Sequence, residues 1–562
     1  MPTIDIDYGE FEKLLGLELH GDLEKVNEIL AYAKGEVKLF YEKEGVMNVE
    51  IQDTNRPDLW NVEGLTRALR GFLGSETGLK KYVAHKSLMK VNVDSKLEPI
   101  RPYIGCSIIE NLRLSDTIIR GLMHLQDKLD QSYGRNRQRT SIGLYNFDLI
   151  KPPLKYGVAD PAEVSFVPLG FEEKLSLKEI LYKHPKGLEY GHIVNKHPVY
   201  PILLDLEGKV LSFPPIINSN DLGKITDQTK NVLVEVTGAV HETVLTVLNI
   251  VTLSLVDRGG KAYTASIHYQ KGMQTVVTPN FEAGSMDLSV EYVNKVSGLT
   301  LSTKQIVELL GRAGFGIEKV SKGVLTVQVP CYRIDVMHPI DLVEDITIAY
   351  GYNNIKPLWR ELPTTGGMRR EQRLLDIARE LMVGLGFQEV LTYTLTNHEN
   401  LFARMNLKKE RVLDIANPKV QTMTCLRSWL LPSLMEFLGN NLSVEYPQRI
   451  FELGKVTMIN ENAETKTRDE ERLTAVVSHA NASFSEIKSC LDAFFMNLGW
   501  EWHIKEAKHP SFIEGRGGTV FLNGAGVGIV GEINPKVLTS WKLENPTVAF
   551  ELQMEKLRSK QK

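Results

Sequence analysis

Two hydrophobic spacings alternate along the first eighty residues, and each predicts a different kind of element. Apolar residues recur at helical spacing in "FEKLLGL" and "WNVEGLTRALRGFLG", whereas "EVKLFYEKEGVMNVEIQD" reads as a pair of strands. Between the strand pair and the second helix lies "NRPDLW", where Asn55 and Asp58 flank Pro57. This turn is expected to cap the helix that follows it. The pattern predicts a compact α/β unit over residues 1–84.

A longer series of strand-like segments follows and predicts a mixed α/β domain over residues 85–275. Its predicted strands are "YIGCSIIENLRL", "TSIGLYNFDL", "YPILLDLEGKVLSFPPIIN", "NVLVEVTG" and "KAYTASIHYQ". A helix is predicted from Val240 to Val256, and Gly259-Gly260 supplies a plausible C-terminal stop.

Two further units complete a multidomain α+β prediction. Residues 276–356 hold a helix beginning in "LSTKQIVELLGRAGFG", where Ser302 and Gln305 have capping-box spacing, and then a strand "GVLTVQVP". Residues 365–562 begin with the amphipathic helix "RREQRLLDIARELMVGLGF" and continue with "RIFELGKVTMI", "RLTAVVSHA" and a hairpin "TVFLNGAGVGIVGEI". The polar stretch "NENAETKTRDEE" is predicted to be an exposed loop.

Length, charge and cysteine spacing exclude several classes of protein. At roughly 150 residues per domain, 562 residues predict three or four domains. No apolar run reaches about 18 residues, and the acidic N-terminus does not resemble a signal peptide, so a soluble cytoplasmic protein without a membrane partner is expected. The four cysteines lie far apart, which argues against a disulfide framework. The net charge of −4 gives no hint of a nucleic-acid partner.

Local charge modifies that last conclusion. Residues 1–80 hold 16 acidic and nine basic residues, while residues 133–155 hold five basic residues and one acidic residue. In the basic stretch Arg135, Arg137 and Arg139 alternate between Tyr133 and Tyr145. Such a cluster is able to grip a phosphate backbone and stack unpaired bases, although a solvated turn explains it equally well.

The densest acidic group consists of Asp335, Asp341, Glu344 and Asp345. The last three stand at i, i+3 and i+4 and would share one face of a helix. Crowded carboxylates suit Mg²⁺ or another hard cation, but acids at a helix N-terminus also complement its dipole without any metal. Both interpretations stay open on spacing alone.

Two other motifs are rejected as functional sites. The spacing of His184, His192 and His197 does not match a helical zinc pair, so they are expected to be loop residues. Gly526, Gly528 and Gly531 satisfy G-x-G-x-x-G, but the "NG" before them indicates a hairpin whose return strand contains these glycines.

Four ordered segments carry a resemblance to a known family. They are "NRPDLWNVEGLTRALRGFLG", "LSFPPIINSN" with "VLVEVTG", "VPCYRIDVMHPIDLVEDITIAYGYNNI" and "IANPKVQTMTCLRSWLLPSLMEFLGNNL". The chain resembles the β subunits of phenylalanyl-tRNA synthetases over nearly its whole length. It is similar to the shorter archaeal and eukaryotic type, because neither the N-terminal oligonucleotide-binding insertion nor the C-terminal anticodon-binding domain of bacterial relatives fits within 562 residues.

The resemblance implies a role for each unit and several partners. Residues 85–275 would hydrolyse tyrosine mischarged onto tRNA-Phe, and residues 276–356 would form a winged-helix-like domain whose Mg²⁺ is held by Asp335, Asp341, Glu344 and Asp345 and shared with the α subunit. Residues 365–562 look like a class II synthetase catalytic domain without its chemistry, since no G-x-G-x-x-R pattern is present to hold ATP. Phenylalanylation of tRNA-Phe with ATP would then require the α subunit, in an α₂β₂ complex.

The resemblance also implies an editing pocket lined by Leu203, Ser212, Asn218, Glu235 and Thr237. An apolar site shaped for phenylalanine rejects a molecule that merely adds a hydroxyl by only about 10²-fold, which is why a second site is needed. Glu235 would accept the phenolic hydrogen bond, and Asn218 and Thr237 would orient the ester or water. The alternative to an editing role is that Glu235 lies on the solvent-exposed face of a strand.

Arg135, Arg137 and Arg139 would contact the tRNA backbone. The rival readings of the chain are an RNA-binding scaffold with an inactive pocket and a free-standing metal hydrolase.

Overall fold

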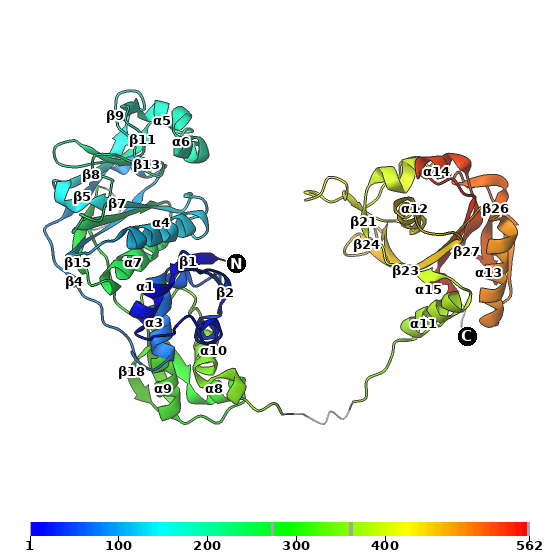
Figure 1. Cartoon of the computed structure of the whole chain (residues 1–562), viewed down its shortest axis with the longest axis horizontal. Helices are drawn as coiled ribbons and strands as arrows, with labels where there is room; N and C mark the ends of the chain where they lie inside the picture. The colour runs from blue at the N-terminus through cyan, green and yellow to red at the C-terminus, as the bar shows by residue number, and fades with distance from the viewer. Residues whose placement is uncertain (1, 271–274, 359–363, 559–562) are drawn as a thin grey trace. The chain divides into compact units, whose positions relative to one another are not determined.

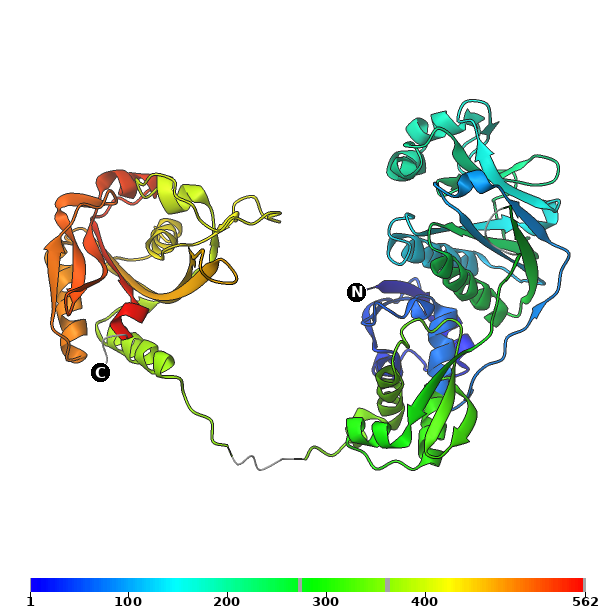
Figure 2. The same cartoon turned by 180° about the vertical axis from the view of Figure 1, so that it is seen from behind.

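A computed structural model describes residues 2–270, 275–358 and 364–558 (Figures 1 and 2). The chain divides into two compact units, Met1–Trp359 and Arg360–Lys562. The multidomain α+β prediction is confirmed, although the three N-terminal units predicted from the sequence pack into one compact body. In the described part of the chain, no helix is both long enough and apolar enough to cross a membrane.

The N-terminal segment folds as predicted into helices around a small antiparallel sheet of order β1-β3-β2. Its elements are β1 (Thr3–Asp7), α1 (Tyr8–Leu15), α2 (Leu23–Leu30), β2 (Gly35–Tyr41), β3 (Val46–Ile51) and α3 (Val62–Phe72). The cap of α3 differs from the prediction: Asn61 accepts the hydrogen bond from the Gly64 amide at 3.0 Å. Asp58 is buried instead against Arg56, whose guanidinium forms two hydrogen bonds to its carboxylate.

The central sheet of the first unit positions the candidate site. Its strands run in the order β13-β12-β11-β8-β5-β15-β6-β14-β7, and β4 and β16 also pair with β15. Their bounds are β4 (Ala84–His85), β5 (Lys90–Val93), β6 (Tyr103–Glu110), β7 (Thr140–Asn146), β8 (Leu154–Ala159), β11 (Tyr200–Leu204), β12 (Val210–Phe213), β13 (Ile217–Asn218), β14 (Val232–Gly238), β15 (Lys261–Tyr269) and β16 (Val276–Thr278). Because β16 belongs to this sheet, the domain extends beyond the predicted boundary at residue 275.

Helices cover this sheet and explain why β14 is buried along its whole length. α4 (Asp116–Gln131) and α7 (His241–Asp257) pack against each other, α7 contacts β6 and β14, and α4 contacts β7 (Figure 1). α7 contains the apolar run "VLTVLNIVTLSLV" and is apolar on most of its surface, which is typical of a helix with protein on most sides. Near β9 (Ser165–Phe166) and β11 lie α5 (Leu177–Lys183) and α6 (Pro185–Tyr190) (Figure 1).

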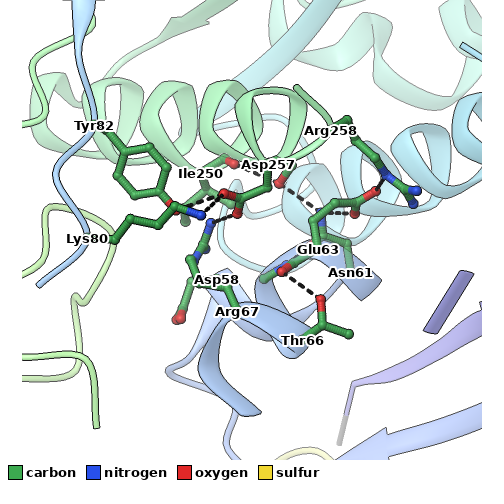
Figure 3. Close-up of polar contacts among 12 residues, drawn as sticks. Asp58, Asn61, Glu63, Thr66, Arg67, Lys80, Tyr82, Ile250, Asp257 and Arg258 are labelled. Carbon is green, nitrogen blue, oxygen red and sulfur yellow. Dashed lines mark hydrogen bonds and ion pairs between the residues drawn. The ribbon is translucent and has the colours of Figure 1, made fainter. Parts of the chain in front are cut away.

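A buried ionic cluster joins the N-terminal segment to the end of α7 (Figure 3). The Asp257 carboxylate accepts hydrogen bonds from Arg67 Nη1 at 2.6 Å, Lys80 Nζ at 3.1 Å and Tyr82 Oη at 2.9 Å. The next residue, Arg258, donates to Glu63 Oε1 at 2.6 Å and also pairs with Glu10. Buried charges of this kind are stable only when they are paired, so the cluster fixes the helix that supports β14.

The last part of the first unit is a smaller sheet with helices. It contains β17 (Gly284–Ser289), α8 (Val290–Ser297), α9 (Thr303–Arg312), β18 (Gly316–Ser321), β19 (Val324–Val329) and α10 (Pro339–Tyr350), with the sheet order β17-β19-β18. The predicted capping box is confirmed: the Gln305 amide donates to Ser302 Oγ, and the Gln305 side chain accepts from the Ser302 amide at 2.9 Å.

The second unit is built on a sheet of order β20-β23-β24-β28-β27-β26-β25. Its strands and helices are α11 (Arg370–Gly384), β20 (Gln388–Glu389), β21 (Leu395–Thr396), η7 (Glu399–Ala403), β22 (Cys425–Leu426), α12 (Leu431–Asn440), β23 (Gln448–Ile459), β24 (Thr467–Ser478), α13 (Phe484–Asn497), β25 (Trp502–Glu506), β26 (Phe512–Leu522), β27 (Ala525–Ile533), α14 (Pro535–Ser540), β28 (Thr547–Gln553) and α15 (Met554–Arg558).

One prediction for this unit is confirmed and one is too broad. The glycine string forms β27, which pairs antiparallel with β26 after a turn in which Asn523 and Gly524 have positive φ, so the hairpin interpretation is correct. The predicted acidic loop is shorter than expected, because β24 already begins at Thr467. Its Glu470 is buried beside Arg472, so this acid pairs rather than faces water.

Candidate functional site

A cavity of about 490 Å³ opens in the first unit beside the β12–β13 hairpin. That volume lies within the range of small-molecule sites. The wall combines apolar side chains with a few polar ones, and the polar and charged residues that line it are Gln126, Asp127, Arg137, Ser141, Lys186, Ser212, Asn218, Asn220 and Lys224.

Two of the five residues expected in the editing pocket line this cavity. Strand pairing places Ser212 opposite Asn218, so both belong to one face of the hairpin. Leu203 pairs with Ser212 from β11 but is fully buried in the hydrophobic core and does not line the cavity.

Glu235 lies directly behind the cavity wall, in the middle of β14. Only 2% of its surface is exposed, which excludes the alternative of a solvent-facing strand position. The Tyr145 hydroxyl donates a hydrogen bond to Glu235 Oε2 at 2.7 Å and lies 3.4 Å from Asn218 Oδ1 at the cavity wall. The other carboxylate oxygen, Oε1, is buried and has no hydrogen bond of normal geometry within the described chain, although the nearby Thr237 hydroxyl also lowers the pKa of this carboxyl group.

Burial controls the protonation of this carboxyl group. Desolvation raises the pKa of Glu235 to about 7, against the lowering effects of the Tyr145 hydrogen bond and the Arg101 charge. Space for the contact comes from Gly143, which stands opposite Glu235 on β7. A Cβ at that position would lie 2.2 Å from the Tyr145 hydroxyl and 2.6 Å from Glu235 Oε2, so the arrangement requires glycine.

Thr237 and Ser141 form the next layer of the same strand pair and are held by Arg101. Pairing places Thr237 opposite Ser141, and their hydroxyl oxygens are 3.3 Å apart. The Arg101 guanidinium, fully buried, donates to Thr237 Oγ1 and to Ser141 Oγ, both at 3.0 Å. It also donates to the Thr237 carbonyl at 2.7 Å, and burial lowers its pKa.

Arg101 and Tyr145 were missed as components of this site. A charged residue just before a strongly apolar strand is the available signal for Arg101, but that signal does not distinguish a buried guanidinium from an exposed one. Tyr145 was interpreted as a base-stacking residue, and the structure corrects this: the ring is fully buried and its hydroxyl is bound to Glu235.

The three alternating arginines do not act as one surface patch. Arg137 is buried, with its Nε 2.9 Å from Asp130 Oδ2 and its guanidinium 4.4 Å from the centre of the Tyr190 ring. Its Nη1 also donates to the carbonyls of Pro215 and Ile216, so it braces the cavity wall and is not a free phosphate contact, contrary to the prediction. Arg135 is exposed and Arg139 is half-buried, and their contact with tRNA stays a prediction.

The acid that faces Arg137, Asp130 near the end of α4, also has a perturbed pKa. Asp130 is buried, and desolvation raises its pKa to about 7 in spite of the neighbouring Arg137 and Arg101 charges. This pair therefore links the cavity wall to the C-terminal end of α4.

The acidic residues around α10 are occupied by basic groups and amides. Asp335 and Asp345 both accept hydrogen bonds from Arg333, with Nη2 2.7 Å and 2.6 Å from their Oδ2 atoms. Glu344 pairs with Lys34, and Asp341 accepts the amides of Met337 and His338 at the N-terminus of α10.

These contacts decide how well the group fits a metal. Four carboxylates are the donor set that Mg²⁺ prefers. However, the described residues do not place these four as a cluster of ligand atoms, and a guanidinium stands between Asp335 and Asp345. The arrangement as it stands does not fit a cation, and the metal-ligand assignment stays a prediction.

His184 and His197 lie outside helices and strands, as expected for loop residues, whereas His192 belongs to the 3-10 helix Gly191–Ile193. His184 caps α6 through its Nδ1, which accepts the Lys186 amide at 3.1 Å, and it packs against Phe171. The described residues do not bring His184, His192 and His197 together as a group of metal ligands.

Comparison with known proteins assigns the whole chain to a family. The family models described as "Phenylalanyl tRNA synthetase beta chain CLM domain" and "tRNA synthetase B5 domain" match residues 355–554 and 286–352. The phenylalanine–tRNA ligase beta subunit of Thermococcus onnurineus (strain NA1) is 43% identical over 572 residues, covering 99% of each chain. The chain belongs to the phenylalanine–tRNA ligase β-subunit family.

A second curated relative and a solved structure support the same family assignment. The Pyrococcus horikoshii phenylalanine–tRNA ligase beta subunit is 43% identical over 559 residues, covering 99% of this chain and 100% of the relative. The crystal structure of an N-terminal fragment of the phenylalanyl-tRNA synthetase beta-subunit from Pyrococcus horikoshii superposes with a TM-score of 0.60 at 40% identity. That match covers 62% of this chain and 100% of the fragment. The family resemblance found in the sequence is thereby confirmed.

Proposed function

We propose that the chain is the β subunit of a cytoplasmic phenylalanine–tRNA ligase and works with an α subunit in an α₂β₂ complex. The α subunit would activate phenylalanine with ATP and transfer it to tRNA-Phe. Full-length similarity to named ligase β subunits supports this assignment. The glycine string that matches G-x-G-x-x-G forms a strand of a β-hairpin and not a nucleotide-binding loop. The likeness of residues 365–562 to a class II catalytic domain and the winged-helix-like character of residues 276–356 are parts of the same proposal.

We further propose that this cavity is the site at which the ester bond of tyrosine mischarged onto tRNA-Phe is hydrolysed. The observation that supports this most strongly is the Glu235 carboxylate behind the cavity wall. One of its oxygens already binds a phenol, that of Tyr145, and the other is buried without a hydrogen-bond partner in the described chain. Because Glu235 stands behind the wall and does not line the cavity, a substrate tyrosine would reach this oxygen only by displacing the groups that cover it, and phenylalanine would have no donor to offer. A site built to hydrogen-bond a hydroxyl rejects the analogue that lacks it by about 10⁴ to 10⁵.

Hydrolysis in this cavity would use water and not a protein nucleophile. Water adds to the ester carbonyl, the bond to the ribose oxygen breaks, and the products are free tyrosine and the tRNA 3′ hydroxyl. Ser212 and Asn218 offer a hydroxyl and an amide at the wall to orient the ester or the water. Thr237 pairs with Ser141 and does not line the cavity, so it would act by holding the Ser141 hydroxyl in place. Lys186 and Lys224 also line the cavity and would attract the phosphates of the tRNA end.

Two parts of the proposal rest on the family likeness alone. Arg135 and Arg139 would contact the tRNA backbone from the turn after α4. Mg²⁺ would be held by Asp335, Asp341, Glu344 and Asp345 only if the α subunit rearranged their present partners, and no step of the reaction is derived through it.

Reconstitution with the α subunit tests both activities. The complex is expected to attach phenylalanine to tRNA-Phe, while neither subunit alone does so. It is also expected to deacylate preformed Tyr-tRNA-Phe and to spare Phe-tRNA-Phe. A complex that phenylalanylates but leaves Tyr-tRNA-Phe intact would show a scaffold with an inactive pocket. Failure to associate with the α subunit would contradict the ligase assignment. Hydrolysis by the β chain alone that a chelator abolishes would instead indicate a free-standing metal hydrolase.

A further inference from the structure

Three potential metal ligands of different chemistry meet in the second unit, far in sequence from the acids of α10. His398, Asp414 and Cys425 each direct one ligand atom toward the others, and these atoms all lie within 4.8 Å of one another. His398 Nε2 is 2.6 Å from Asp414 Oδ1. Among the described residues, no other group of three or more His, Cys, Asp or Glu side chains brings its ligand atoms this close together.

Backbone pairing, and not chance proximity of flexible side chains, brings these residues together. β21 pairs with β22, with Thr396 opposite Cys425. Asp414 forms a bridge to Cys425 from the other side, supported by hydrogen bonds from the Ile415 amide to Thr424 O and from the Leu426 amide to Leu413 O. His398 stands two residues after the end of β21 and directly before η7.

The surroundings of the three ligand atoms are those of a partly enclosed site. Cys425 is fully buried, whereas the Asp414 side chain is 61% exposed and the His398 side chain 24%. Ions can therefore reach the group from the Asp414 side while the sulfur stays shielded from solvent. The His398 ring stacks on Phe402 with 6.1 Å between centroids, which fixes its orientation.

The donor set selects the class of ion. Imidazole, carboxylate and thiolate together suit Zn²⁺ and similar transition ions, and they do not suit Mg²⁺ or Ca²⁺, which prefer oxygen alone. We propose that His398, Asp414 and Cys425 form a Zn²⁺ site with three protein ligands and one position open to water. The ion ties the segment between β21 and β22 to the strands that begin and end it.

Two features limit the affinity of this site. Burial raises the pKa of Cys425 to about 11, so an ion has to displace the thiol proton in order to bind. In the described chain, His398 Nδ1 is buried without a hydrogen-bond partner, whereas the second nitrogen of a zinc-bound imidazole usually has one. The site is therefore expected to bind more weakly than a structural site with four ligands.

Cobalt titration of the full chain tests the proposal. The chain is stripped with a chelator and titrated with Co²⁺, which reports thiolate ligation through a sulfur-to-cobalt charge-transfer band. The expected result is one Co²⁺ per chain with that band, and displacement of the band by Zn²⁺. Cys425→Ser should abolish the band, and His398→Ala and Asp414→Asn should each weaken Zn²⁺ binding by more than the roughly 10- to 100-fold that loss of a second-shell partner costs.

A matched control separates ligation from general damage. Cys490 is a second buried cysteine of the same unit, on α13 and beside Arg449, and Cys490→Ser should leave the band unchanged. Circular dichroism of the metal-free variants checks that each one folds. Co²⁺ binding without the charge-transfer band, or Zn²⁺ uptake by Cys425→Ser equal to that of the parent, would overturn the proposal. Neither outcome bears on tRNA editing, because these residues lie in the other unit of the chain.

Discussion

Tyr145→Phe is the sharpest probe of the buried carboxylate that defines the candidate pocket. The change removes one hydroxyl whose acceptor is Glu235 Oε2, 2.7 Å away, and leaves the ring in place. A hydrogen bond to a charged group contributes about 1.5–3 kcal/mol and one to a neutral group about 1 kcal/mol. The cost of the substitution should therefore depend on whether Glu235 is ionised.

The direction of that pH dependence follows from the pKa of Glu235. Burial raises the pKa of Glu235 from 4.5 to about 7. The protonated carboxyl group therefore contributes its full stabilisation of the folded state below pH 4.5, and this stabilisation is lost as the pH rises through about 7. At 1.36 kcal/mol per pKa unit, the loss across this window is about 3 kcal/mol. Removing the Tyr145 hydroxyl raises the pKa further, because that hydrogen bond favours the ionised form. The variant should therefore lose about 1 kcal/mol relative to the parent at pH 5.5 and about 1.5–3 kcal/mol at pH 8.

A matched control exists in the same domain. Tyr156 is equally buried, and its hydroxyl donates at 2.9 Å to the Arg101 carbonyl, a neutral acceptor. Tyr156→Phe should lose about 1 kcal/mol at both pH values. Hydrogen exchange of β14 peptides in the full chain measures the opening free energy of this region separately from the second unit. Equal, pH-independent losses in the two variants would refute the reasoning.

Three other substitutions test separate parts of the account. Gly143→Ala should remove Tyr-tRNA-Phe deacylation by the reconstituted complex while phenylalanylation persists, because the added Cβ would displace the Tyr145 hydroxyl and the Glu235 carboxylate. Full deacylation by this variant would contradict the steric requirement for glycine. Asp257→Asn should destabilise the first unit by about 3 kcal/mol, since it leaves Arg67 buried and unpaired, whereas Asp116→Asn in an exposed pair should change urea stability by less than about 0.5 kcal/mol. Arg135→Ala should reduce the salt dependence of tRNA binding by about one ion without changing stability, and an unchanged slope in a filter-binding assay would exclude this contact.

Local patterns predicted the elements well wherever the decisive interactions are local. The capping box of Ser302 and Gln305 involves residues three apart, and the hairpin before β27 depends on the adjacent Asn523 and Gly524. The helix predicted from Val240 to Val256 is α7, which the structure shows to be buried on most sides. These features need no knowledge of the rest of the fold.

Partners from distant segments could not be predicted in the same way. Glu344 pairs with Lys34, 310 positions away, and the spacing of acids on a helix carries no information about such a cation. Arg137 was predicted to contact a phosphate backbone because it alternates with Arg135 and Arg139, yet the turn directs it onto Asp130 and the carbonyls of the β12–β13 hairpin. A count of charges along the sequence describes the average charge of a segment. It does not say which of the charged side chains is buried against a distant partner.

The five pocket residues show the same division. Ser212 and Asn218 line the cavity because β12 pairs with β13. Glu235 stands behind the wall on β14 and is linked to Asn218 through the Tyr145 hydroxyl. Leu203 belongs to the core, and the position of Arg101 before an apolar strand did not reveal that its guanidinium is buried and holds Thr237. The family resemblance located the region, and the packing of the folded domain decided which side chains reach the cavity.

Deacylation of preformed Tyr-tRNA-Phe by the reconstituted complex tests the central claim most directly. The parent complex should release tyrosine, and Asn218→Ala should slow that release by at least about tenfold while the rate of phenylalanylation stays the same. Asn249→Ala, which removes a buried amide on α7 that donates to the Asn280 carbonyl, serves as the control and should behave like the parent. Equal tyrosine release by the Asn218 variant, or none by the parent complex, would contradict the account.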